Sequence, residues 1–500
     1  MKKRCFAALS VLICTILTAS SCGAETGELP LSSTASETTM ESAADTAAET
    51  AVISETEEVS AMEAVDYDGR IVNVLTFSNA DYLTSEVDII AEASDGTTIN
   101  DAVFERNSKL MEKYNIDFGF FKGGNAGTAL NKVSKAVKAG EKAYDIIFET
   151  AESAIKLGTS GNLLEVHSLP NLSIDKPWWN QRLLESSAIL GNNFFLIGDM
   201  NIDTWSVSYV VFFNKILAAA YDIPDLYEIV KSGTWTIDKL DSLTKLVYTD
   251  LNGNGEYDEN DLYGLAACSV CIDCFWASAD VNFVVPDENG LTLQFTDTYY
   301  GLWDKMTNLL QKPEMLYTDR PQYSSKRDVY DRQAFKEDRA LFYVEGLYCT
   351  YTNINLREMK SDFGILPLPK YDEKQDFYRT YTHPTHNSTI SFPITAEDDI
   401  DMLTKITEDM AFYSRSIIRP AYYDSLLTGK VARDENSIAM LDILTENIIY
   451  DHAFLLLFNS MTFPMRSQIN NGKPAASWAE SSLKKFQKEL DKFVEQVSEN

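Results

Sequence analysis

Short apolar runs typical of buried strands alternate with stretches that carry apolar side chains at helical spacing. The predicted strands cover residues 71–77, 116–121 and 144–148, and the predicted helices cover residues 97–114 and 129–138. Strands and helices that alternate in this way predict an α/β fold with a largely parallel sheet. Because ligands of such sheets bind beyond the carboxyl ends of the strands, a functional site is expected near residues 149–152.

The rest of the chain has a different pattern and no internal repeat. Further strands are predicted at residues 193–197, 206–213, 342–344 and 363–366, with a helix at residues 236–248. From residue 400 onward the pattern is mostly helical and ends in an amphipathic stretch at residues 481–497. At 500 residues and 45% hydrophobic content, the chain is long enough for two or three lobes.

The N-terminus has the pattern of an export signal. A cationic start at residues 1–4 precedes a mostly apolar run at residues 6–19, which is shorter than the roughly 20 residues that span a bilayer. Small residues and then Cys22 follow, and this arrangement resembles a bacterial lipoprotein signal. The sequence therefore predicts a signal peptide at residues 1–22, acylation of Cys22 and an extracytoplasmic protein anchored to the cell membrane by lipid alone. Ordinary secretion is the alternative.

Acidic residues dominate the next segment and the whole chain. Residues 23–69 contain twelve acidic residues and no Lys or Arg, so residues 23–65 are predicted to form a disordered tether. The net charge of −32 argues against nucleic acid or an anionic lipid surface as a partner, because both require basic patches.

The cysteines and histidines argue against most metal enzymes. Cys268, Cys271 and Cys274 are spaced Cys-x-x-Cys-x-x-Cys, with Cys349 as a distant fourth. A zinc or iron–sulfur site is one interpretation, but small buried residues or one disulfide are favoured for an exported chain. The chain has only four histidines, so a histidine-rich metal enzyme is not expected.

The sharpest local motif is an acidic loop at residues 250–261. Oxygen donors stand at loop positions 1, 3, 5, 9 and 12, glycine stands at position 6, and a backbone carbonyl serves position 7. The predicted calcium ligands are therefore Asp250, Asn252, Asn254, Glu256, Asp258 and Asp261. A strand rather than a helix is predicted after the loop, which favours a structural calcium clip over a sensor. An Asn-Gly turn without metal is the alternative.

Several motifs in order give the body a resemblance to a known family. The matching pieces are residues 98–107 (TINDAVFERN), 144–147 (YDII), 160–164 (SGNLL), 213–215 (FNK), 233–236 (GTWT), 339–342 (RALF) and 362–370 (DFGILPLPK). Together they resemble extracellular solute-binding proteins of the carbohydrate ABC-importer type (family 1). The resemblance implies two α/β lobes joined by crossing strands, a two-lobed periplasmic-binding-protein-like fold in which a sugar lies between the lobes. It also implies that the lobes close on the sugar and that the closed form delivers it to the permease.

The same resemblance implies the lobe boundaries and a set of ligand contacts. Lobe one is expected at residues 66–200 plus 363–415, and lobe two at residues 201–362 plus 416–500. Aromatic rings stack on sugar C–H faces, and carboxylates bind paired hydroxyls. The expected ligand contacts are Glu149, Glu152, Trp205, Trp276 and Tyr348, with Glu345 as a further candidate. Residues 380–387 are expected to line the cleft; a metal site at His383 and His386 is disfavoured because Pro384 lies between them.

Two other classes of function stay open at this point. An exported glycan-active enzyme is one, but no acid/base pair, Gly-x-Ser-x-Gly or His-Glu-x-x-His motif is recognisable, so no enzyme activity is expected. A calcium-dependent surface module is the other, although dockerins pair two such loops and only one occurs here. We expect a monomer whose partners are a carbohydrate and the transmembrane subunits of an ABC permease; a peptide or another solute also stays possible as the ligand.

Overall fold

The computed structural model describes residues 60, 62–80, 83–287, 290–320, 329–350, 356–427 and 435–499. The predicted signal peptide, Cys22 and the tether up to residue 59 lie outside the described residues. Within them, no helix combines the length and the apolar character that a membrane crossing requires.

The first sheet confirms the strand and helix pattern predicted for the start of the body. Its strand order is β13-β5-β1-β4, in which β1 pairs in parallel with both β4 and β5, and β13 pairs antiparallel with β5. The strands are β1 (Arg70–Thr76), β4 (Ile116–Lys122), β5 (Ile146–Glu149) and β13 (Thr389–Ser391). We call this sheet and the elements that accompany it the first lobe. These elements are α1 (Glu86–Ile89), α2 (Thr98–Tyr114), α3 (Ala126–Ala139), α4 (Ala151–Thr159), α5 (Gln181–Ser187), the 3-10 helices η1 (Val166–Ser168) and η5 (Ile394–Asp399), and the short pair β2 (Ser78–Ala80) and β3 (Leu83–Thr84).

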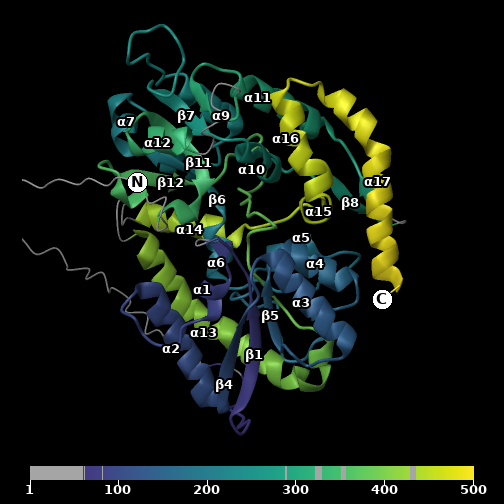
Figure 1. Cartoon of the computed structure of the whole chain (residues 1–500). Coiled ribbons are helices and arrows are strands. Elements are labelled where there is room, and N and C mark those ends of the chain that lie inside the picture. The colour runs from purple at the N-terminus through teal and green to yellow at the C-terminus, as the bar shows by residue number, and fades with distance from the viewer. Residues whose placement is uncertain are drawn as a thin grey trace, which may run out of the picture. The chain divides into compact units, whose positions relative to one another are not determined.

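The second sheet is mixed rather than largely parallel. Its order is β10-β7-β11-β6-β12, and β6 runs antiparallel to both of its neighbours. The strands are β6 (Tyr209–Asn214), β7 (Tyr263–Ala267), β10 (Met315–Tyr317), β11 (Ala340–Gly346) and β12 (Phe363–Leu366). We call this sheet and its accompanying elements the second lobe (Figure 1).

Two predictions about these segments need correction. The segment 363–366, expected in lobe one, pairs with β6 and so belongs to the second sheet. Residues 193–197 form no strand, because Leu196 makes only an isolated bridge to Ile390 at the end of the first sheet. The other lobe boundaries stay predictions.

Helices complete the second lobe and the C-terminal part of the chain, which confirms the mostly helical pattern predicted after residue 400. Those before β12 are α6 (Ile202–Ser206), α7 (Lys215–Ala220), α8 (Leu226–Lys231), α9 (Ile237–Thr244), α10 (Val270–Ser278), α11 (Asp297–Leu310), α12 (Tyr330–Lys336), η3 (Leu347–Thr350) and η4 (Leu356–Glu358), with strands β8 (Val284–Asp287) and β9 (Gly290–Leu293). Later helices are α13 (Ile400–Leu427), α14 (Glu435–Glu446), α15 (His452–Leu456), the π-helix η6 (Phe458–Thr462), α16 (Phe463–Asn470) and α17 (Ala475–Glu499).

Three chain segments lie side by side where the lobes join. Ser208 bridges Thr382 in antiparallel fashion, and Thr380 bridges Ile448 in parallel fashion. The first of these segments leads from α6 into β6, and the second leads from β12 back to β13. These crossings place the carboxyl ends of β5 and β11 toward the junction of the lobes, and ligands of open sheets bind at such ends.

Candidate functional site

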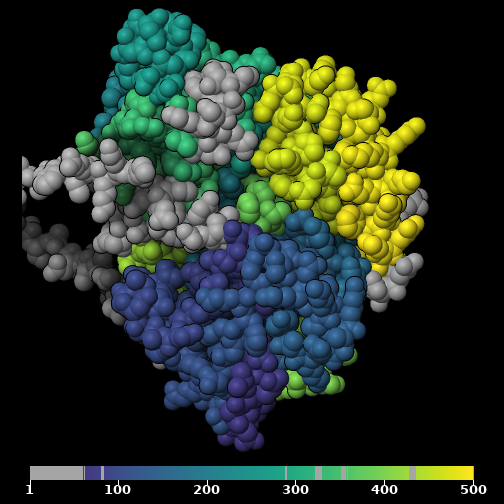
Figure 2. All heavy atoms as spheres, viewed as in Figure 1, coloured from purple at the N-terminus to yellow at the C-terminus, as the bar shows by residue number. Residues whose placement is uncertain are grey.

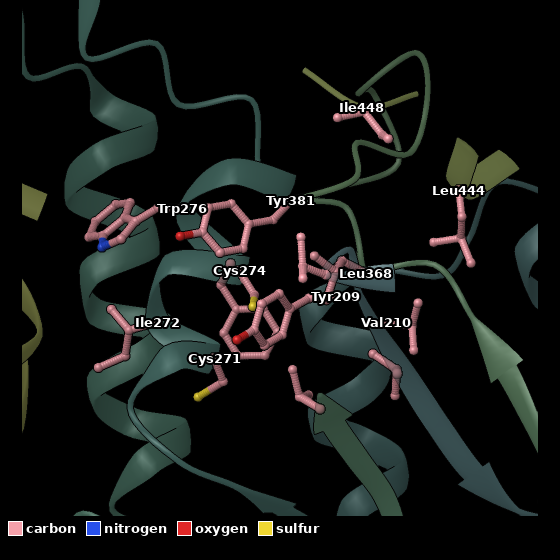
Figure 3. Close-up of a cluster of buried hydrophobic side chains, with 14 of the residues drawn as sticks. Tyr209, Val210, Cys271, Ile272, Cys274, Trp276, Leu368, Tyr381, Leu444 and Ile448 are labelled. Atoms are coloured by element: carbon pink, nitrogen blue, oxygen red, sulfur yellow. The ribbon is translucent and has the colours of Figure 1, made fainter. Parts of the chain in front are cut away.

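Side chains from six chain segments meet beside the crossings, at the junction of the two lobes. We call Tyr209, Asp273, Glu345, Tyr348, Tyr381, His383, Phe458 and Arg466 the boundary cluster. The rings of Tyr209 and Tyr381 lie 5.6 Å apart, with Cys274 of α10 beside them (Figure 3). The space-filling view shows the junction on one face, where blue atoms of the first lobe meet green and yellow atoms (Figure 2).

An ion pair lies at the centre of the cluster. Arg466 of α16 donates from Nε to Asp273 Oδ1 at 3.0 Å and from Nη2 to the other carboxylate oxygen. Both residues are buried, and burial raises the pKa of Asp273 while Arg466 opposes that rise. The guanidinium also lies 5.9 Å from the ring of Phe458 and 5.0 Å from that of Phe463, which is half exposed. Arg466 is therefore fixed in a bidentate geometry at the edge of the second lobe.

Glu345, at the end of β11, accepts hydrogen bonds from two tyrosine hydroxyls and one backbone N–H, and the guanidinium of Arg332 is near enough to act on its charge. Its Oε1 accepts from the hydroxyl of Tyr348 at 2.8 Å and from the backbone N–H of Gly346, and its Oε2 accepts from the hydroxyl of Tyr343 at 3.2 Å. Burial raises the pKa of Glu345, and these hydrogen bonds oppose the rise. Tyr348 is 8% exposed, so its ring lies just beneath the surface of the cluster.

The loop at residues 383–387 covers the cluster from the crossing side. The rings of His383 and His386 stack at 4.2 Å, and that of His383 lies 4.8 Å from the ring of Phe458. Burial lowers the pKa of His383 well below its usual value and that of His386 to about 4. Both imidazoles are therefore neutral at pH 7. The loop lies between the two lobes. Its expected role in lining a ligand cleft stays a prediction.

The two predicted carboxylates of the first lobe have different surroundings. Glu149 is fully buried; its Oε2 accepts from the N–H of Thr150 at 3.2 Å, and its Oε1 has no partner among the described residues. Burial raises the pKa of Glu149 to about 8. Glu152, one turn later, is partly exposed and accepts from Asn459 of the π-helix at 2.8 Å and from Lys156. The Glu152–Asn459 hydrogen bond therefore joins the two lobes.

The two predicted tryptophans lie away from the boundary cluster. Trp276 is 0% exposed and stacks on Tyr299 at 5.4 Å, within an aromatic core that also includes Trp303 and Phe283. Trp205, in α6, is buried against Tyr422 at 5.2 Å and lines a separate cavity behind the crossings. The ligand role of all five predicted residues stays a prediction.

The cysteines confirm the interpretation as small buried residues. Cys268, Cys271, Cys274 and Cys349 are all buried, and none of them forms a disulfide with another described cysteine. Among the described residues, no group of three or more His, Cys, Asp or Glu side chains is arranged to hold a metal ion.

The acidic loop at residues 250–261 is closed at its base by a bridge between Thr249 and Leu262, and β7 follows as predicted. Asp250 accepts from the N–H groups of Gly253 and Gly255, and Asp258 accepts from the side chains of Asn252 and Asn254 at 3.0 and 2.8 Å. The predicted ligand atoms are all oxygens, which suits a hard cation such as calcium. The structure draws these oxygens into hydrogen bonds within the loop, and calcium binding stays a prediction.

Sequence reasoning missed the ion pair that organises the cluster. Asp273 lies in the apolar segment CIDCFW, and Arg466 follows the apolar segment MTFPM. A single charge within an apolar run is costly to bury without a partner, so each of these residues carried a detectable signal. Which charge would pair with which could not be read, because 193 residues separate the two.

Comparison with known proteins gives the fold its place. No protein-family model matches the chain, and no curated protein matches it. Solved structures do: M. tuberculosis UspC matches at a TM-score of 0.54 and 13% identity over 83% of this chain and 98% of that chain. UgpB from Mycobacterium tuberculosis, solved in complex with glycerophosphocholine, matches at a TM-score of 0.52 and 14% identity. The match covers 79% of this chain and 96% of that chain. The galacto-N-biose-/lacto-N-biose I-binding protein of the ABC transporter from Bifidobacterium longum matches at a TM-score of 0.51 and 12% identity. The match covers 86% of this chain and 98% of that chain. The chain therefore has the two-lobed periplasmic-binding-protein-like fold that its sequence predicts.

Proposed function

We propose that the chain is the solute-binding component of an ABC importer and that it captures a sugar or oligosaccharide between its lobes. The observation that carries this proposal is the boundary cluster, in which aromatic rings, tyrosine hydroxyls and one fixed guanidinium gather where the lobes join, beside the carboxyl end of β11 and the start of β6. Rings and hydroxyl-binding groups in this mixture suit the apolar faces and hydroxyls of a sugar. The sugar-binding neighbour from Bifidobacterium longum, which has the same fold, supports the same choice of ligand.

The protonation states favour a ligand without net charge. Asp273 is paired with Arg466, the two histidines are neutral, and burial disfavours the charged form of Glu345. A neutral polyol satisfies such groups without leaving an unpaired charge in a closed site. Binding without turnover is proposed, since the neighbours of this fold named above include a binding protein of a transporter.

Delivery and location complete the proposal. The lobes would close on the sugar, and the closed monomer would present it to the transmembrane subunits of a permease. Acylation of Cys22 would hold the protein at the outer face of the cell membrane, and the calcium loop would act as a structural clip in the second lobe. Mass spectrometry of the exported chain tests the anchor, because an acylated cysteine adds a defined mass to the new N-terminus.

A thermal-shift screen against mono- and oligosaccharides, with calcium present, tests the ligand class. A ligand at 100 times its dissociation constant adds about 2.7 kcal/mol to stability, which is a shift of a few degrees for a chain of this size. We expect a shift with one neutral glycan, with no glycan consumed, and its loss in Tyr348→Ala. The matched control is Tyr300→Ala, which removes a half-exposed ring elsewhere in the second lobe. A shift with peptides alone would contradict a sugar as the ligand. Consumption of the glycan would show that the protein is an enzyme.

A further inference from the structure

A cavity of about 280 Å³ lies behind the crossings, apart from the boundary cluster. The first lobe contributes Trp179, Arg182 and Asp199 to its walls, and α6 contributes Trp205. Helix α13 contributes Arg415 and Arg419, one turn apart. Its volume is just below the roughly 300–1,000 Å³ typical of small-molecule pockets, so it suits a ligand of a single ring.

Two of the three arginines are held by carboxylates. Buried Asp199 accepts from Arg415 Nη1 at 3.1 Å and from Arg419 Nη1 at 3.5 Å. Arg419 also donates from Nη2 to Asp442 at 3.0 Å and to Glu446 at 3.2 Å. Arg419 therefore pairs with three carboxylates, which fix its guanidinium in the wall of the cavity.

Arg182 differs from them because its charge is unmatched. Its guanidinium lies 4.2 Å from the ring of Phe377, and among the described residues it makes no ion pair or hydrogen bond. The nearby Arg379 is already paired with Asp280. Arg415 uses only its Nη1, on Asp199 and on the carbonyl of Pro177, so a second guanidinium edge is free within the described part of the chain.

The walls of the cavity thus carry more positive than negative charge, in a chain whose net charge is −32. Three guanidinium groups line it against the carboxylates of Asp199 and Glu446. Free guanidinium donors are the preferred partners of a carboxylate, and indole rings provide flat apolar surface for a ring beside it. Both features are present before any ligand arrives, because Phe377 holds Arg182 and Asp199 holds Arg415.

We propose that this cavity is a second ligand site, specific for a small organic acid in which one carboxylate is attached to a six-membered ring. The carboxylate binds to Arg182 and Arg415, and the ring packs against the indoles of Trp179 and Trp205. A sugar acid and an aromatic acid share this chemistry. An occupant would touch the first lobe, α13 and the end of α14, so by linkage it would also bias the lobe angle; this last consequence alone rests on the proposed function.

Isothermal titration of the purified chain tests the site with three probes: D-glucuronate, benzoate and the neutral ring D-glucose. We expect saturable binding of glucuronate, benzoate or both at this site. Arg182→Gln should weaken it at least about tenfold, since it removes a charged hydrogen-bond donor to the carboxylate. Arg182→Lys should retain part of the affinity because it keeps the charge. Arg70→Gln, which removes the same charge at the start of β1, should leave binding unchanged.

The outcomes separate this site from the boundary cluster. Binding of glucuronate alone identifies a sugar acid, and binding of benzoate alone identifies an aromatic acid. Equal binding in Arg182→Gln and the parent, loss of binding in Tyr348→Ala, or no binding of either acid at millimolar concentration would each overturn the proposal. Glucose that bound with the same sensitivity to Arg182→Gln would also overturn it, because the charge would then not be recognised. None of these results bears on whether a neutral glycan shifts the melting temperature of the parent.

Discussion

The boundary cluster and the acidic loop at residues 250–261 are both rich in carboxyl groups, yet they treat these groups in opposite ways. In the cluster, burial raises the pKa of Glu345 and Asp273. In the loop, Asp258 is only partly buried, and the N–H of Asn260 together with the amides of Asn254 and Asn252 lowers its pKa. The same residue type is thus driven toward its neutral form in one region and its charged form in the other.

The difference shows what each region can bind. A carboxyl group that is neutral or already paired offers hydrogen bonds to an uncharged ligand. Charged oxygens near the surface suit a cation, because little desolvation has to be overcome, and calcium binding here stays a prediction. Breaking either arrangement should therefore give a distinct signature.

The largest effect is expected from Arg466→Ala. This change leaves Asp273 buried without its partner and should lower the free energy of unfolding by about 3–5 kcal/mol. Urea denaturation measures the loss. Lys109→Ala is the matched control, because Lys109 and its partner Glu105 are both half exposed and such a pair contributes about 0–1 kcal/mol. If Arg466→Ala were as mild as the control, the cluster would not depend on the ion pair.

Next in size is the pH dependence carried by Glu149. Its folded-state pKa of about 8 lies above the ordinary value of 4.5, so the native state holds the proton more tightly than the unfolded state. The contribution of Glu149 to stability is therefore present below about pH 4.5 and is lost as the pH rises toward 8. Glu149→Gln should match the parent most closely at pH 5 and exceed it at pH 8 in chemical denaturation. A parent and variant with parallel pH profiles would show that Glu149 titrates normally.

Calcium should have a moderate effect through the loop. Titration after chelation should show one binding event in the parent, and chelator should lower the melting temperature by a few degrees, because an ion bound only to the folded state stabilises it. Asp250→Ala removes loop position 1 and should abolish both effects, whereas Asp222→Ala, outside the loop, should preserve them. If Asp250→Ala bound calcium as tightly as the parent, the predicted calcium site in this loop would be wrong.

The smallest effect is expected at the Glu152–Asn459 contact. Asn459→Ala removes one partly exposed hydrogen bond between the lobes and should cost about 0.5–1.5 kcal/mol at most. Glycan affinity should fall a few-fold, since the closed form loses one contact. The adjacent Ser460→Ala serves as the control. Unchanged affinity in Asn459→Ala would show that the contact plays no part in closure.

The sequence predicted local features well and assembled features poorly. The strands and helices of residues 70–150 and the loop before β7 were readable because their signals lie within one contiguous stretch. The edge position of β12 was not, since its four apolar residues can pair with either sheet. Tyr348 and Glu152 were expected as ligand contacts through the resemblance, and that role stays a prediction. Trp276 was also expected at a ligand but lies in a core, because an aromatic residue on a buried helix has the same sequence pattern in both roles.

The origin of the first sheet's last strand has a consequence for how the chain folds. All five strands of the second sheet come from the continuous stretch between residues 209 and 366, but β13 joins β5 across a separation of 240 residues, from Glu149 to Thr389. Closing so long a loop is slow and entropically costly compared with local pairing. The first lobe therefore cannot complete its sheet until the whole sequence of the second sheet is present. A chain cut after residue 362 would lack the last strand of both sheets.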